Sequence, residues 1–283
     1  MEYLYSKSNA LLLLKRADES LVVLESAIAM DPSNQKLRNS LSNVKKEAIT
    51  RYGSLIKLDP KQPEYFYNRG KLLFEIKRYK ECLQDAEQAV ALSGDNPEYR
   101  YLRGRSYLAT GVYDIALDDL TFAVSEKPDE PAYVSGRAVA LARTGSVKDA
   151  LAEADSLKAG DSPDIAFDLG IVYGIAGRTE DAIHNFDAAI ALLPAESSYH
   201  LEKGNVLFSS ENYDPALSEY DIALSLDPGD GVATYSKAEC LFRMGKAGMS
   251  TPFYKKASEL NPQNHVFRFT YGLHLFNDKM VGE

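Results

Sequence analysis

Small residues recur along the chain with a period close to 34 residues. One series advances by 34 or 32 residues at each step: Gly70, Gly104, Ala138, Gly170, Gly204 and Ala238. A second series follows it by twelve residues (Cys82, Ala116, Ala150, Ala182, Ala216, Ser250), and a third lies seven further on (Ala89, Ala123, Leu157, Ala189, Ala223, Ala257). Small side chains at such places let two antiparallel helices approach closely. The pattern therefore predicts a series of helix hairpins.

Glycine and proline mark the ends of the predicted helices. Gly111, Gly145, Gly177 and Gly245 each lie seven residues after a residue of the first series, where a left-handed residue would end the first helix. The second helix is predicted to stop just before a proline, because proline lacks an amide donor and disfavours the helical conformation of the preceding residue. These prolines are Pro128, Pro194, Pro228 and Pro262. Each unit is therefore predicted to be helix, turn, helix and stop.

A helix–turn–helix of 34 residues with Gly, Ala, an aromatic residue, Ala and Pro in this order resembles the tetratricopeptide repeat (TPR). Residues Tyr65 to Gly70 and Tyr213 to Leu217 carry the resemblance most strongly, although the chain has no tryptophan, which the family often places in its first helix. The resemblance implies an all-α, right-handed α-solenoid of stacked TPR repeats.

The resemblance also implies a division of the chain. We expect six consecutive TPR units over residues 63–264, preceded by a TPR-like hairpin over residues 1–33 that ends at Pro32. Residues 34–62 would form either an irregular repeat or one long helix, and the stretch 34–58 is a candidate place for a subdomain boundary. Residues 265–283 would form a half-repeat or a capping helix. If they form a half-repeat, we expect the chain to be part of a longer protein.

Composition argues against several classes of protein. The formal net charge is −9, and no basic run is longer than the pairs Lys45–Lys46 and Lys255–Lys256, so we do not expect nucleic acid as a partner. The apolar run Leu11 to Leu14 is too short for a signal segment or a membrane span. We therefore expect a cytoplasmic protein without membrane insertion.

The residue pattern also predicts no catalytic site, no metal site and no cofactor. Cys82 and Cys240 lie far apart within predicted helices, where we expect buried free thiols. The four histidines have no spacing that would gather two of them on one helix face beside a carboxylate. Asp118 and Asp119 are interpreted as acids that stabilise the beginning of a second helix. We therefore predict that the chain is not an enzyme.

The resemblance places the side chains at positions two, five, nine and twelve of each unit on a concave surface. The predicted partner-binding residues on or beside it are Tyr67, Asn68, Lys71, Phe74, Tyr101, Arg105, Arg143, Phe167, Asn205, Phe208, Tyr235 and Phe242. Rings of this kind often anchor protein contacts, and the cations would orient the partner. The alternative is that several rings only pack against the neighbouring helix. We expect alanine at Tyr67, Tyr101 or Tyr235 to weaken binding without unfolding the array.

The leading hypothesis is a non-enzymatic scaffold that binds a protein or peptide segment. The alternative is the regulatory or targeting TPR region of a larger enzyme or co-chaperone, and a third possibility is self-association through the terminal repeats. A known use of this fold is to bind the C-terminal carboxylate of a chaperone. Asn68 and Asn205 match asparagines of that clamp, but Glu98, Leu102 and Leu201 stand where its cations are needed. We therefore do not expect a carboxylate clamp.

Overall fold

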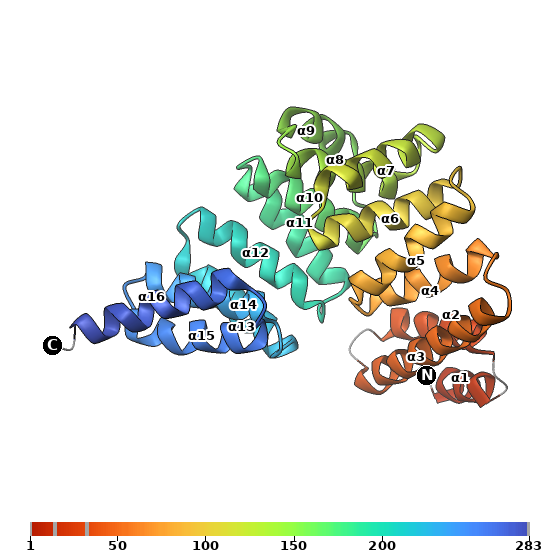
Figure 1. Cartoon of the computed structure of the whole chain (residues 1–283), viewed down its shortest axis with the longest axis horizontal. Helices are drawn as coiled ribbons and strands as arrows, with labels where there is room; N and C mark the ends of the chain where they lie inside the picture. Colours follow the sequence, from red (N-terminus) through yellow and green to blue (C-terminus); the bar gives the residue numbers. More distant parts are fainter. Residues whose placement is uncertain (1, 14–15, 32–33, 282–283) are drawn as a thin grey trace. The chain divides into compact units, whose positions relative to one another are not determined.

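The computed structural model describes residues 2–13, 16–31 and 34–281. These residues form sixteen α-helices and no strand (Figure 1), which confirms the predicted all-α fold. Two residues named above, Leu14 and Pro32, lie outside the described ranges.

The chain divides into two compact units, one ending at Ala150 and the other beginning at Leu151. The first unit contains α1 (Glu2–Leu13), α2 (Ala17–Met30), α3 (Gln35–Leu58), α4 (Pro63–Glu75), α5 (Tyr79–Leu92), α6 (Pro97–Thr110), α7 (Tyr113–Glu126) and α8 (Pro131–Arg143). The second contains α10 (Pro163–Ile175), α11 (Thr179–Leu192), α12 (Ser197–Ser209), α13 (Tyr213–Leu226), α14 (Gly231–Arg243), α15 (Ala247–Leu260) and α16 (His265–Val281), while α9 (Val147–Ser156) spans the division. The division therefore does not fall within residues 34–58, where α3 is one unbroken helix.

The small residues of the first helices are placed where the second helix of the same hairpin comes closest. A Cβ atom added to the glycine would lie 2.8 Å from Leu120 at Gly104, 2.6 Å from Phe186 at Gly170 and 2.7 Å from Tyr220 at Gly204. Real Cβ contacts are longer than this, so any larger residue would push the helices apart. This confirms that the small positions allow close packing of the hairpins.

The turns inside the hairpins share one backbone conformation. Gly111, Gly145, Gly177 and Gly245 all have positive φ values, between 75° and 93°, as predicted for residues that end a first helix. The corresponding turns after α4 and α12 have Lys77 and Glu211 instead, each with φ of 61°. Repetition of the fold thus imposes a left-handed residue even where no glycine is present.

Helix ends follow the local sequence. Proline occupies the first turn of α4, α6, α8 and α10, where its missing amide hydrogen costs no intrahelical bond. The side chain of Asn96 accepts hydrogen bonds from the backbone amides of Glu98 and Tyr99 and so caps α6. The second helices α7, α11, α13 and α15 end two residues before Pro128, Pro194, Pro228 and Pro262, as predicted.

The first hairpin, α1 and α2, has the same packing as the regular ones. Ser8, Ser20 and Ala27 are fully buried at the three small positions, and the hydroxyl oxygens of Ser8 and Ser20 lie 2.8 Å apart. At the other end of the chain, α16 packs against α15 as a single helix. The repeat register therefore extends to both α1 and α16.

Candidate partner-binding face

We call the surface formed by positions two, five, nine and twelve of the first helices the first-helix face. It is described for α4, α6 and α8 in the first unit and for α10, α12, α14 and α16 in the second. Tyr67, Tyr101, Phe167 and Tyr235 occupy its fifth position, and Phe74, Phe208 and Phe242 its twelfth. Lys71, Arg105 and Asn205 occupy its ninth position. Asn68 follows the fifth position by one residue, and Arg143 follows the twelfth by one residue.

These four rings at the fifth position each pack on a ring at the third position of the next first helix. The pairs and their centroid distances are Tyr67–Tyr99 at 5.0 Å, Tyr101–Tyr133 at 4.6 Å, Phe167–Tyr199 at 4.9 Å and Tyr235–Phe267 at 4.6 Å. Tyr101 and Tyr235 are stacked on their partners, with interplanar angles of 28° and 14°. The rings therefore join successive hairpins as well as lining the face.

The two rings of each pair differ in solvent exposure. Tyr99, Tyr133, Tyr199 and Phe267 are buried, whereas the fifth-position rings remain half-buried. The third-position partners were missed at the sequence level. A signal was present, because in all four pairs the two rings are 32 residues apart in the chain. Each half-buried ring of these pairs thus packs on a buried aromatic ring that restricts its movement.

The rings at the twelfth position make edge contacts. Phe74 packs on Tyr79 at 5.2 Å and Phe208 on Tyr213 at 5.6 Å, each within its own hairpin. Phe242 packs on His274 of the next first helix at 4.7 Å and is still 43% exposed. The twelfth position thus combines contacts inside the array with surface that a partner could cover.

The predicted polar residues differ in how firmly they are held. The ammonium of Lys71 lies 5.5 Å from the ring centre of Tyr67, and the guanidinium of Arg143 lies 5.9 Å from that of Tyr113. Asn205 accepts a hydrogen bond from the Tyr220 hydroxyl at 3.1 Å. Asn205 therefore helps to fix a buried ring of its own hairpin, whereas Lys71 is exposed beside a ring of the face.

Two phenols of the face have a pKa above the ordinary value for tyrosine, and burial is the main cause. Burial raises the pKa of Tyr67, and the nearby Glu98 and Tyr99 add to the effect. Burial likewise raises the pKa of Tyr235, whose hydroxyl lies 3.3 Å from that of Thr270. These hydroxyls are therefore neutral hydrogen-bonding groups near neutral pH.

The first-helix face changes character between the two units. In the first unit, Glu64 and Lys71 are exposed on α4, and Glu98 of α6 pairs with Lys127. In the second unit, α14 exposes Val232 and Phe242, at 49% and 43%. The first unit thus offers a charged face with rings, and the second offers a more apolar one.

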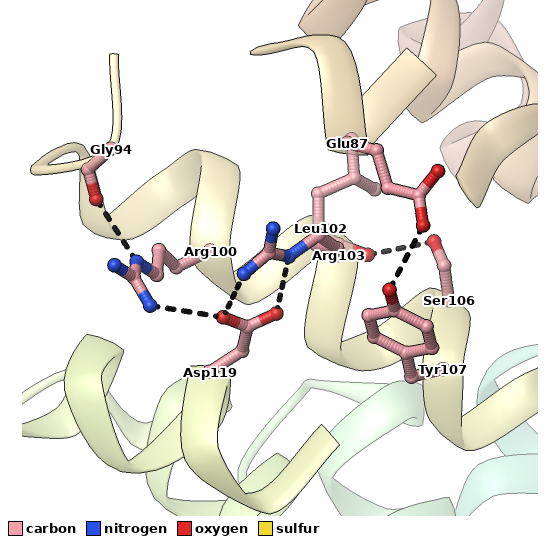
Figure 2. Close-up of polar contacts among 8 residues, drawn as sticks. All are labelled: Glu87, Gly94, Arg100, Leu102, Arg103, Ser106, Tyr107 and Asp119. Carbon is pink, nitrogen blue, oxygen red and sulfur yellow. Dashed lines mark hydrogen bonds and ion pairs between the residues drawn. The ribbon is translucent and has the colours of Figure 1, made fainter. Parts of the chain in front are cut away.

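A buried ion pair joins the two helices of one hairpin (Figure 2). The guanidinium of Arg103 on α6 donates two hydrogen bonds of 2.7 Å to the carboxylate of Asp119 on α7, and Arg100 donates a third at 3.3 Å. Beside it, the Tyr107 hydroxyl donates to Glu87 at 2.9 Å. The Asp119 side chain is 1% exposed. The sequence interpretation of Asp119 as an acid that stabilises the beginning of a helix is therefore wrong, because both oxygens bind arginines of the preceding helix.

The same arrangement recurs in other hairpins. Arg69 binds Asp85 through two bonds of 2.7 and 2.6 Å, and Lys203 contacts Glu219 at 2.6 Å. In all three pairs the acid follows the cation by sixteen residues. Burial alone would raise the pKa of Glu219, but hydrogen bonds from His200 and Lys203 outweigh it and lower the pKa. These charges are therefore used inside the hairpins and are not free for a partner.

Other chemistry is scarce in the described part of the chain. No group of three or more potential metal ligands occurs among the described residues. Burial raises the pKa of both cysteine thiols, Cys82 and Cys240, to about 11, and both are free and buried as predicted. None of the described helices has the length and apolar character needed to cross a membrane.

Comparison with known families agrees with this architecture. Models of the tetratricopeptide repeat match residues 101–165 and 167–231 and residues 63–96, and a TPR repeat model matches residues 46–77. Together the matches cover well over half of the chain. The chain belongs to the tetratricopeptide repeat family, and its fold is the TPR α-solenoid, a scaffold for protein–protein interaction.

Individual similar proteins are distant. The BBSome complex member bbs-4 of Caenorhabditis elegans is 26% identical over 112 residues, which are 40% of this chain and 24% of bbs-4. Human IFIT1, solved as a dimer with m7Gppp-AAAA, is 15% identical with a TM-score of 0.71, over 96% of this chain and 72% of that one. The APC/C hetero-tetramer Cut9–Hcn1 is 15% identical with a TM-score of 0.66, over 96% of this chain and 55% of that one. The chain thus spans about a quarter of bbs-4 and about half of the Cut9–Hcn1 chain.

Proposed function

We propose that this chain is a non-enzymatic scaffold that binds a helix or an extended segment of a partner protein on its first-helix face. The observation that carries the proposal is the set of half-exposed rings Tyr67, Tyr101, Phe167 and Tyr235, each fixed by a ring of the next first helix. A ring that is already immobilised loses little conformational entropy when a partner covers it, so it makes an efficient anchor.

The charges beside these rings give the proposed contact its orientation. Lys71 is exposed next to Tyr67, and Arg105 follows at the equivalent position of α6. A partner segment with an acidic side chain next to an apolar one would match this part of the face. On α14 the exposed Val232 and Phe242 favour a more apolar part of the partner.

Descriptions of similar proteins support a role in assembly. The bbs-4 protein is described as a member of the BBSome complex, and Cut9 was solved with Hcn1 as part of a hetero-tetramer. A regulatory or targeting region of a larger enzyme or co-chaperone remains the alternative function. The expected absence of nucleic-acid partners and the cytoplasmic location stay predictions.

The proposal is tested by reversing charge on and off the face. The double variant Lys71→Glu/Arg105→Glu changes the ninth position of α4 and α6. The matched control Lys80→Glu/Lys148→Glu makes the same change in net charge at exposed positions of the second helices α5 and α9. Each protein serves as bait in affinity purification with quantitative mass spectrometry, and the affinity of a recovered partner is then measured by calorimetry.

We expect the face variant to lose a partner that the wild type and the control both retain, with at least tenfold weaker affinity. Equal recovery by all three proteins would contradict binding on this face. Loss from the control alone would place the partner on the second helices.

A further inference from the structure

The second half of α3 occupies the place of a second helix in the repeat register. It ends at Leu58, 34 residues before α5 ends at Leu92. Ala48 of α3 is fully buried, as is Cys82 of α5 one repeat later. Residues of α3 can therefore be compared with their equivalents in the later second helices, which follow at steps of 34 or 32 residues.

Four of the later second helices carry an acid at one repeat position, and each of these acids contacts the next first helix. The contacts are Glu87 with Tyr107 at 2.9 Å, Asp155 with Tyr173 at 3.1 Å, Asp187 with Lys203 at 2.8 Å and Asp221 with Lys237 at 2.5 Å. At the same position α7 has Thr121, α15 has Lys255 and α3 has Gly53. From this position α3 therefore offers no carboxylate to α4.

Arg69 of α4 is the residue that such an acid of α3 would contact. It stands at the repeat position of Lys203, which lies between two carboxylates. Lys203 contacts Asp187 of the preceding second helix at 2.8 Å and Glu219 of its own hairpin at 2.6 Å. Arg69 has a carboxylate only on the side of its own hairpin, where it binds Asp85. The repeat pattern thus places a second anion on the other side of Arg69, toward α3.

A cavity of about 360 Å³ is lined by residues of α3, α4 and α5. Gly53 forms part of its wall, and a Cβ atom added there would lie 3.3 Å from Nη1 of Arg69. Arg69 binds Asp85 through Nε and Nη2, so the pair uses two of the five N–H donors of the guanidinium and leaves Nη1. This side of Arg69 therefore faces the space beside the glycine.

Two further cations line the same cavity, Lys57 of α3 and Arg78 just before α5. Arg78 donates from Nε and Nη2 to Glu81 and, like Arg69, keeps Nη1. Lys57 forms no ion pair with any residue that the structure describes. The lining holds three cations and two acids, Glu81 and Asp85, and each acid is bound by one arginine. The cavity thus combines unused N–H donors with one positive charge in excess.

We propose that this cavity binds a phosphate group, free or carried by another molecule, at the place that a carboxylate such as Asp187 has in other repeats. Arg69 and Arg78 donate to it through Nη1, and Lys57 through its ammonium. A phosphate group has three acceptor oxygens and a charge of about −1.5 to −2 near neutral pH, so it can use all three cations, whereas a carboxylate has two oxygens. Guanidinium groups also form strong, charge-assisted hydrogen bonds with phosphate. None of the lining residues belongs to the first-helix face.

The binding of inorganic phosphate tests the cavity directly. Titration calorimetry near neutral pH and at constant ionic strength compares inorganic phosphate, acetate and a short peptide that contains phosphoserine. The cavity variant Lys57→Gln/Arg78→Gln removes two exposed cations of the lining. The matched control Lys80→Gln/Lys148→Gln makes the same change in net charge at exposed residues that do not line the cavity. Thermal melting without phosphate checks that both variants are folded.

A second pair of variants supplies the acid from within the chain. Gly53→Asp adds a carboxylate beside Arg69, in the way that Asp187 lies beside Lys203, and Gly53→Asn adds a side chain of nearly the same volume without the charge. We expect Gly53→Asp to melt at a higher temperature than Gly53→Asn and to bind inorganic phosphate at least tenfold more weakly than the wild type. Equal melting temperatures of the two variants would overturn the proposal, because Arg69 would then gain nothing from an anion at this place.

We expect the wild type and the control to bind inorganic phosphate with equal affinity, and the cavity variant to bind it at least tenfold more weakly. Tighter binding of the phosphoserine peptide would identify a phosphorylated segment as the source of the group, and equal binding would show that the free anion suffices. Absence of binding to the wild type, equal affinities of the wild type and the cavity variant, or acetate binding as tight as that of phosphate would each overturn the proposal. No partner of the first-helix face is present, so failure here leaves the proposed partner binding untouched.

Discussion

In the first unit, the second helices carry Ala86 and Leu120 sixteen residues after the small residues Gly70 and Gly104. In the second unit, Phe186, Tyr220 and Tyr254 occupy the equivalent place, and all three are fully buried. The first unit adds the buried ion pairs Arg69–Asp85 and Arg103–Asp119, whose bonds are bidentate. The second unit has the pair Lys203–Glu219 as well, but here rings also form hydrogen bonds across the hairpin, since Tyr220 donates to Asn205 and Tyr254 to Glu239.

This difference shows that one backbone repeat admits two ways of closing a hairpin. Where the second helix contributes a smaller apolar side chain, a charged pair crosses the hairpin and satisfies its own hydrogen bonds. Where a ring fills the space, dispersion and apolar burial contribute more to the stability of the hairpin. The second unit should therefore be more sensitive to loss of volume, and the first to loss of a charge.

The largest effect is expected for Phe186→Ala in the second unit. Phe186 is completely buried against Gly170, so its removal loses apolar burial and leaves a cavity. We expect the free energy of unfolding to fall by about 3–5 kcal/mol. Denaturant unfolding with hydrogen exchange would locate the loss in α10 and α11, since repeats depend mainly on their neighbours. A loss below about 1 kcal/mol would mean that the helices collapse to fill the space.

The next effect is expected for Asp119→Asn in the first unit. The amide cannot accept from Arg103 and Arg100 as the carboxylate does, and the arginines regain only part of their hydration. We expect a loss of about 1–3 kcal/mol. The neighbouring exposed Asp118 supplies the control, because Asp118→Asn should change stability by less than about 0.5 kcal/mol. If denaturant unfolding shows that both variants lose a similar free energy of unfolding, the ion pair has no special role in stability.

Replacing the stacked rings compares the same contact in the two units. Tyr101→Ala removes a contact with Tyr133, and Tyr235→Ala removes one with Phe267. Both tyrosines are half-buried, so we expect each to cost about 1–3 kcal/mol in thermal unfolding. The sequence suggested that these substitutions would leave the array intact, and the stacking revises that expectation. Tyr101→Phe keeps the stacked ring and should melt close to the wild type.

The smallest expected effect is an increase in the free energy of unfolding, and it is expected in both units. Lys77 in the first unit and Glu211 in the second have φ of 61°, a conformation that disfavours residues with a Cβ atom. Glycine at either site should stabilise the chain by about 0.5–1 kcal/mol, after the entropy that glycine itself loses on folding. Gly111→Ala, at the equivalent turn, should destabilise it in the same thermal assay. A lower melting temperature for both glycine variants would show that the positive φ of Lys77 and Glu211 does not destabilise the chain.

Much of the fold could be read from the sequence because its signals repeat. The small residues Gly104 and Gly170 and the turn glycines Gly111 and Gly177 each belong to a series, so every position is supported by its equivalents in the other repeats. The left-handed conformation of Lys77 could not be read from its residue type. It follows from the position in the repeat, since the neighbouring helices fix the path of the turn.

The candidate face was harder to predict because it depends on contacts between different helices. Tyr67 and Tyr99 lie on different helices, and reading each helix alone placed Tyr67 on the face without its partner. Asp119 was misread for the same reason, because its arginines are sixteen and nineteen residues away. Fixed spacings of 32 and 16 residues carry both kinds of contact, and comparing positions across repeats would have found them.

The ring pairs also determine which repeats could be exchanged in an engineered chain. Deleting residues 97–130 would bring Tyr67 opposite Tyr133, so a ring would still meet a ring. Deleting residues 197–230 would bring Phe167 opposite Ala233, and a methyl group would stand where Tyr199 now packs. The modules of this array are therefore interchangeable in some places and order-specific in others, although their backbones are nearly alike.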